Sequence, residues 1–281
     1  APGKGSFSTL ADALLERGQL QYKQRQHREA IQMYQAVLRV RSDKTLAWRL
    51  MAEPLLALKR YQEAGESLDR YLETIPVAST GKAPTPEVAT KLARTLKARG
   101  LLHANQGDYR AALESYARGL KLNRDPETLA LRGWSYLILQ SPYLARLDFD
   151  EAIQKQPTLG NAWLGRANAQ IKLGRLSEAL KDVKEGLQFS PKSRRTFYNA
   201  ARVYAQAVSQ ARQTARPSRV VVSRCERRAV ELLASALARL SAGEQKAFWQ
   251  KYVIADRAFL SIRSGEAMQV LSSRIGAPDS R

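Results

Sequence analysis

Cysteine and histidine are nearly absent from this chain of 281 residues. The only cysteine is Cys225, so the sequence allows no disulfide within one chain and no metal site built on two thiolates. The two histidines, His27 and His103, stand far apart in the sequence, without a clustered carboxylate at ligand spacing. The sequence therefore predicts no metal site and no other cofactor.

Long apolar runs and recognisable catalytic motifs are also missing. No segment has the roughly 18 consecutive apolar residues that a helix needs to span a bilayer. The sequence contains neither a glycine-rich phosphate loop nor a nucleophile elbow. A single cysteine requires no oxidising compartment. We therefore expect a cytoplasmic protein that is not an enzyme.

Acidic residues are much scarcer than basic ones. Lysine and arginine together number 46, aspartate and glutamate 26, and the formal net charge is +20. Such an excess attracts acidic partners over long distances and speeds their encounter with the protein. The charge of this basic protein favours an acidic partner, but it does not distinguish a protein from a nucleic acid.

The chain does contain a repeated pattern in units of 34 residues, each anchored on an alanine. In the first five units another small residue precedes this alanine by twelve positions, and an insert lengthens that interval in the sixth. Two helices of a hairpin approach closely only where neither carries a bulky side chain, so the pattern predicts helix hairpins. The six pairs are Gly18 and Ala30, Ala52 and Ala64, Gly100 and Ala112, Gly133 and Ala145, Ala167 and Ala179, and Ala201 and Ala229.

This pattern resembles the tetratricopeptide repeat family. Large apolar residues stand early in the predicted first helices, and prolines stand where the second helices must end. These residues are Trp48, Trp163, Phe197, Pro76, Pro157 and Pro191. The resemblance implies an all-α fold: a right-handed α-solenoid, or superhelix, of about six helix-turn-helix units with a C-terminal helical cap.

The repeat alignment also divides the chain into segments. The expected segments are a flexible N-terminus (1–10), units one and two (11–78), a loop and helix extension (79–92), units three to five (93–193), unit six (194–241), capping helices (242–275) and a flexible tail (276–281). Unit six carries a basic insert at about 208–227, which we expect to be a mobile loop or an extended helix pair. The start without Met indicates a tag scar, a processed end or a piece of a larger parent chain, of which we favour the last. Unit six looks like the tetratricopeptide tails of bacterial signalling enzymes.

In the family, the first helix of each unit lines a concave groove that holds a peptide. The matching positions give an apolar middle and cationic ends, which suit a peptide with acidic flanks. They are Arg49, Lys97, Leu101, Trp134, Leu137, Leu164, Asn168, Ile171, Tyr198 and Arg202. For Trp134, packing against a neighbouring helix of the same chain remains an equal alternative. The Lys and Asn clamp that grips chaperone C-termini in some family members is not matched here.

The resemblance thus implies a non-catalytic scaffold or regulatory module that binds another protein or peptide. One alternative is binding of nucleic acid or another polyanion through the basic surface and the insert. A third hypothesis is a passive spacer that sets the distance between fused domains. The arginines of the insert are Arg212, Arg216, Arg219, Arg224 and Arg227. If the insert holds these arginines close to Cys225, they should lower the pKa of its thiol.

Overall fold

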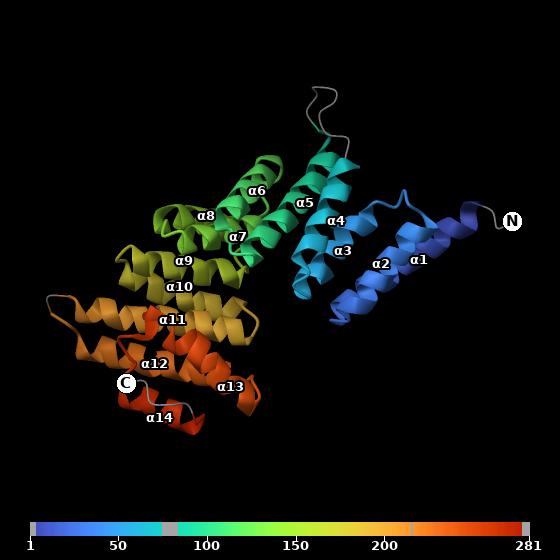
Figure 1. The fold of residues 1–281 in the computed structure, drawn as a ribbon. Coiled ribbons are helices and arrows are strands. Elements are labelled where there is room, and N and C mark those ends of the chain that lie inside the picture. The colour runs from blue at the N-terminus through green and yellow to red at the C-terminus, as the bar shows by residue number, and fades with distance from the viewer. Residues whose placement is uncertain (1–3, 75–83, 215, 277–281) are drawn as a thin grey trace. The chain divides into compact units, whose positions relative to one another are not determined.

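The computed structural model describes residues 4–74, 84–214 and 216–276 (Figure 1). Every regular element in these ranges is a helix, and the predicted all-α solenoid class with a C-terminal helical cap is confirmed. The chain divides into two compact units, residues Ala1–Ser135 and Tyr136–Arg281. In the described part of the chain, no helix is both long enough and apolar enough to cross a membrane.

The first compact unit is built from helix hairpins. Consecutive helices from α1 to α6 pack against one another, and α3 also packs against both α1 and α5. The helices are α1 (Lys4–Lys23), α2 (His27–Val40), α3 (Leu46–Ala57), α4 (Tyr61–Glu73), α5 (Pro86–Asn105) and α6 (Tyr109–Leu122), followed by α7 (Pro126–Ile138), which runs into the second unit. Helix α1 begins at Lys4, inside the segment 1–10 that the sequence predicted to be flexible.

The anchor alanines lie where the two helices of a hairpin meet. Ala30, Ala64 and Ala112 are fully buried. Two of their small partners, Gly18 and Gly100, accommodate an aromatic ring from the second helix: a methyl group at Gly100 would lie only 2.3 Å from Cε1 of Tyr116. The small residue is therefore required by the close approach of this ring.

The second compact unit continues the hairpins and ends in shorter helices. Here α8 packs on α9, α9 on α10, α10 on α11 and α11 on α12, while α11 also contacts α9 and η2. The elements are α8 (Pro142–Lys155), α9 (Gly160–Lys172), α10 (Leu176–Phe189), α11 (Arg194–Arg212), α12 (Arg219–Leu237), α13 (Ala242–Phe248), the π-helix η1 (Trp249–Ile254), the 3-10 helix η2 (Arg257–Phe259) and α14 (Glu266–Arg274).

The basic insert is largely helical. Helices α11 and α12 are 19 residues long each, and Figure 1 shows them side by side. Of the two forms expected for residues 208–227, the structure has the extended helix pair. The loop expected from residue 79 lies mostly outside the described residues, as does the tail from residue 276.

Candidate functional site

A hollow of about 290 Å3 lies between α3 and α5 in the first compact unit. Each of these two helices is the first helix of its hairpin. Its lining residues are Arg49, Glu53 and Leu56 from α3 with Arg94, Lys97, Ala98 and Leu101 from α5. The structure thus brings together three of the groove residues that the sequence predicted, Arg49, Lys97 and Leu101. We refer to this hollow as the α3–α5 groove.

Two charged residues of the α3–α5 groove are engaged within the chain. Lys97 Nζ lies 3.2 Å from an oxygen of Asp125 and 2.6 Å from one of Glu127. Burial lowers the pKa of Lys97, but the hydrogen bonds and charges of these two carboxylates outweigh it and raise the pKa. Glu53 accepts a hydrogen bond from the Tyr22 hydroxyl. Burial is the main cause that raises the pKa of Tyr22, and the Glu53 carboxylate raises it further.

The remaining cations of the groove, Arg49 and Arg94, form no ion pair with a described residue. Arg94 and Lys97 also line a neighbouring hollow of about 140 Å3. Sequence analysis missed Arg94, although it stands three positions before Lys97 and therefore on the same helix face. The groove thus presents two guanidinium groups without an ion-pair partner beside Leu56 and Leu101, together with the Glu53 carboxylate.

Three apolar residues of the predicted groove are buried in the structure. Leu137, Leu164 and Ile171 are only 5%, 2% and 6% exposed, so they are core residues. Leu164 packs against Gly186 on α10, where a methyl group would meet its Cδ2 at 2.7 Å. Asn168 is equally buried and donates a hydrogen bond from Nδ2 to the Leu164 carbonyl oxygen at 2.8 Å. Because neighbouring helices fill the space around these side chains, they offer little surface to a partner.

Trp134 lies on α7 and is half-buried. It is therefore neither a fully exposed anchor for a partner nor a fully buried core residue, and both alternatives for it stay open.

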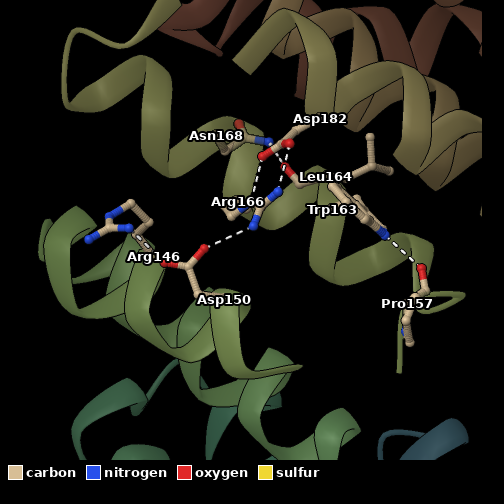
Figure 2. Close-up of polar contacts among 8 residues, drawn as sticks. All are labelled: Arg146, Asp150, Pro157, Trp163, Leu164, Arg166, Asn168 and Asp182. Carbon is tan, nitrogen blue, oxygen red and sulfur yellow. Dashed lines mark hydrogen bonds and ion pairs between the residues drawn. The ribbon is translucent and has the colours of Figure 1, made fainter. Parts of the chain in front are cut away.

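Charged residues near Leu164 and Asn168 neutralise one another, as Figure 2 shows. The Arg166 guanidinium donates from Nε and Nη2 to the two oxygens of Asp182, at 2.6 and 2.8 Å, and from Nη1 to Asp150 at 2.9 Å. Asp150 accepts a further bond of 2.6 Å from Arg146. Two arginines and two aspartates therefore form a network without net charge that ties α8, α9 and α10 together.

Trp163 completes this network on α9. Its ring lies under the Arg166 guanidinium, with Cζ 4.7 Å from a ring centroid, and its Nε1 donates to the Pro157 carbonyl oxygen at 2.7 Å (Figure 2). Burial lowers the pKa of Arg166, but the hydrogen bonds to Asp182 and Asp150 raise it further than burial lowers it. These contacts hold helices of the chain together, and we therefore assign the network to the stability of the fold and not to ligand binding.

The cap engages the last two predicted groove residues, Tyr198 and Arg202 on α11. The Tyr198 hydroxyl donates to Asp256 Oδ2 at 2.8 Å, and Arg202 Nε lies 2.5 Å from the same oxygen. The Tyr198 ring packs against Phe248, Tyr252 and Phe259. The cap therefore occupies the positions at which the sequence predicted a partner.

The arginines of the insert are distributed along α11, α12 and the link between them. Arg212 pairs with Glu226 and donates to the Ser261 carbonyl oxygen. Arg227 lies 3.9 Å from Glu231. The other three are exposed and form no ion pair with a described residue; they are Arg216, Arg219 and Arg224.

Cys225 is 1% exposed, and burial is the main cause that raises the pKa of its thiol, while Arg224 only partly opposes it. The expected lowering of this pKa is therefore corrected, because burial of the thiol outweighs the charge of Arg224. In the described ranges, no cluster of three or more His, Cys, Asp or Glu residues is arranged to hold a metal ion.

Comparison with known proteins agrees with the helix hairpins. Residues 15–79 and 97–160 match the family model described as tetratricopeptide repeat. Among solved structures, PilF of Pseudomonas aeruginosa has a TM-score of 0.57 and 16% identity, over 78% of this chain and 97% of that one. The C-terminal part of a tetratricopeptide repeat-containing protein of Cytophaga hutchinsonii has a TM-score of 0.55 and 13% identity, over 92% of this chain and 95% of that one. Both likenesses concern the fold alone.

Curated proteins with related sequences include the Hsp70-Hsp90 organizing protein of Triticum aestivum. It is 26% identical over 191 residues, which cover 68% of this chain and 31% of the relative. Serine/threonine-protein phosphatase T of Trypanosoma brucei brucei is 26% identical over 98 residues, or 35% of this chain and 21% of the relative. The chain thus spans about a third or less of the length of these relatives.

Proposed function

This chain belongs to the tetratricopeptide repeat family, and on that premise we propose that it is a scaffold or regulatory module that binds an acidic segment of a partner polypeptide in the α3–α5 groove. It acts by binding and not by catalysis. The repeats and the sequence similarity to Hsp70-Hsp90 organizing proteins support a protein-interaction module.

The observation that carries this proposal is the pairing state of the cations in the groove. Lys97 is neutralised by Asp125 and Glu127, whereas Arg49 and Arg94 have no ion pair with a described residue. Guanidinium groups bind carboxylates with two parallel hydrogen bonds. A partner carboxylate between these arginines would gain this interaction without displacing an acid of the chain.

Apolar contacts in the same groove define the second feature of the partner. Leu56 and Leu101 line the hollow beside the arginines and are half-buried, so each still offers side-chain surface. Covering apolar surface contributes about 25 cal/mol per Å2. The expected ligand is therefore an extended or helical segment with acidic residues around one apolar side chain.

The test is a titration with a fluorescein-labelled peptide of nine residues, a central leucine flanked by aspartates and glutamates, followed by fluorescence anisotropy. We expect the exchanges Arg49→Glu and Arg94→Glu each to weaken binding by roughly tenfold, because each reverses a charge facing the ligand. Arg110→Glu is the matched control, since this exposed arginine lies on α6 and does not line the groove. Equal losses in all three variants would show that only net charge matters and would overturn the proposal.

A mixed-sequence oligonucleotide is the comparison ligand for the polyanion alternative. Binding to phosphates falls steeply with salt because counterions are released, so the titrations are run at about 50 and 200 mM salt. The exposed Arg216 and Arg219 would carry such binding. If the oligonucleotide binds, Arg216→Glu and Arg219→Glu weaken it, and the peptide does not bind, the alternative replaces the proposed function.

A further inference from the structure

A separate hollow of about 230 Å3 lies in the second unit, where α10, α11 and α12 pack together. Its lining residues are Leu180 and Lys184 from α10, Tyr204 from α11, and Val221, Arg224, Cys225, Arg227, Arg228 and Glu231 from α12. None of these residues belongs to the α3–α5 groove, and we call this hollow the α12 pocket.

The floor of the α12 pocket is apolar. Tyr204 and Cys225 are buried, and Leu180 and Val221 are half-buried. Burial raises the pKa of Tyr204 and the nearby Arg228 partly opposes this, and the buried ring forms part of the wall. An apolar cavity of roughly 150 Å3 suffices to bind benzene, so this hollow has room for a group of phenyl size.

The rim of the α12 pocket carries an excess of positive charge. Four of its lining side chains are cationic and one is a carboxylate, which leaves three positive charges in excess. Glu231 is shared by Arg228 at 2.9 Å and Arg227 at 3.9 Å. Lys184 and Arg224 form no ion pair with a described residue. An anionic ligand would meet cations that no acid of the chain neutralises.

We propose that the α12 pocket binds a small organic anion, a carboxylate or phosphate carried on an apolar group of about phenyl size. The apolar group enters between Leu180, Tyr204 and Val221, where it is removed from water. The anionic group stays at the rim within reach of Arg224 and Lys184. Pockets for small ligands commonly combine an apolar lining with a few placed polar groups in this way.

The experiment separates the two parts of the ligand by isothermal titration calorimetry on the intact chain. The probes are phenyl phosphate, phenylacetate, inorganic phosphate and benzyl alcohol. We expect phenyl phosphate or phenylacetate to bind with a dissociation constant on the order of 0.1–1 mM, and the stronger of the two identifies the anion. The anion alone and the neutral ring alone should bind at least roughly tenfold more weakly, because each lacks one half of the interaction.

Variants locate the site. Arg224→Glu should weaken binding of the preferred aromatic anion by roughly tenfold, while Arg219→Glu on the same helix, outside the lining, should leave it unchanged. Val221→Trp, which fills the mouth of the pocket, should abolish binding, and circular dichroism confirms that each variant is folded. Because Cys225 is the only cysteine, its reaction with neutral N-ethylmaleimide should also slow when the pocket is occupied.

Three outcomes would overturn the α12 pocket as a site: no aromatic anion binds below about 10 mM, Arg219→Glu weakens binding as much as Arg224→Glu, or the ligand leaves the Cys225 rate unchanged. Arg94→Glu in the α3–α5 groove should not alter binding of the aromatic anion. The failure of this inference and the failure of the proposed peptide groove are therefore distinguishable.

Discussion

The hydroxyl of Tyr198 on α11 donates a hydrogen bond of 2.8 Å to the carboxylate of Asp256, which lies 58 positions further along the chain. The Tyr252 carbonyl oxygen, 3.0 Å from this hydroxyl oxygen, shares the same hydrogen. Asp256 in turn pairs with Arg202 and caps the short helix η2 by accepting from the Ala258 amide at 2.9 Å. One carboxylate thus joins the last long helix pair to the C-terminal cap.

Replacement of this carboxylate is expected to loosen the cap. Asp256→Ala leaves Tyr198 and Arg202 without their partner, and we expect it to lower the free energy of unfolding by about 2–3 kcal/mol. Tyr198→Phe, which keeps the ring against Phe248 and Phe259, should cost only about 1 kcal/mol. Urea unfolding of both variants and of the double variant measures the coupling between the two residues. Strictly additive losses would contradict the assigned hydrogen bond.

The repeats were predictable from the sequence because their cause is local and periodic. Gly100 and Ala112 stand at a fixed spacing, and the close approach of two helices in one hairpin requires small residues at both positions. The hairpins and the all-α class followed from that pattern.

The burial of individual groove positions was not predictable, because it depends on which face each helix turns toward its neighbours in space. Leu164 occupies a family groove position, yet it packs against Gly186. Tyr198 occupies another, yet it contacts a cap whose sequence has no repeat period. Cys225 stands among arginines in the sequence, but its direction on α12 was fixed only by the packing of that helix on α11.

A methyl group at Gly100 tests the packing of the third hairpin. Gly100→Ala should destabilise the protein by about 1–3 kcal/mol, because the new Cβ would overlap the Tyr116 ring. Gly65→Ala on α4 is the matched control, since its nearest contact would be an ordinary 3.5 Å from Leu102. There the higher helix propensity of alanine should stabilise by up to about 1 kcal/mol. Thermal unfolding measures the stability of both variants. Equal shifts in their melting temperatures would show that the Tyr116 ring does not restrict the side chain at position 100.

A substitution at the buried end of the network around Arg166 should destabilise the fold more than a substitution at its exposed end. The Asp182 side chain is 6% exposed and that of Asp150 is 34% exposed. Asp182→Ala removes two hydrogen bonds from a largely buried guanidinium, and we expect a loss of about 2–3 kcal/mol. Asp150→Ala, where water can replace the carboxylate, should cost about 1 kcal/mol. Urea unfolding gives both values, and the reverse order would be inconsistent with Arg166 being held chiefly by Asp182.

The Asp125 carboxylate should make the stability of the first compact unit decrease at acidic pH. Burial raises its pKa, but the hydrogen bonds from Thr128, at 2.9 Å from the amide and 2.6 Å from the hydroxyl, and the nearby Lys97 outweigh burial and lower the pKa below its usual 3.8. Because the folded-state pKa lies below the unfolded one, the carboxylate stabilises the fold above about pH 4, and this contribution is lost as the pH falls through the folded-state value. Asp125→Asn should therefore lower the free energy of unfolding by about 1 kcal/mol at neutral pH, screening by solvent included, and by progressively less as the solution is acidified. Urea titrations of both proteins between about pH 7 and 3 measure the difference, and a gap that stays constant over this window would disprove the role of the carboxylate charge.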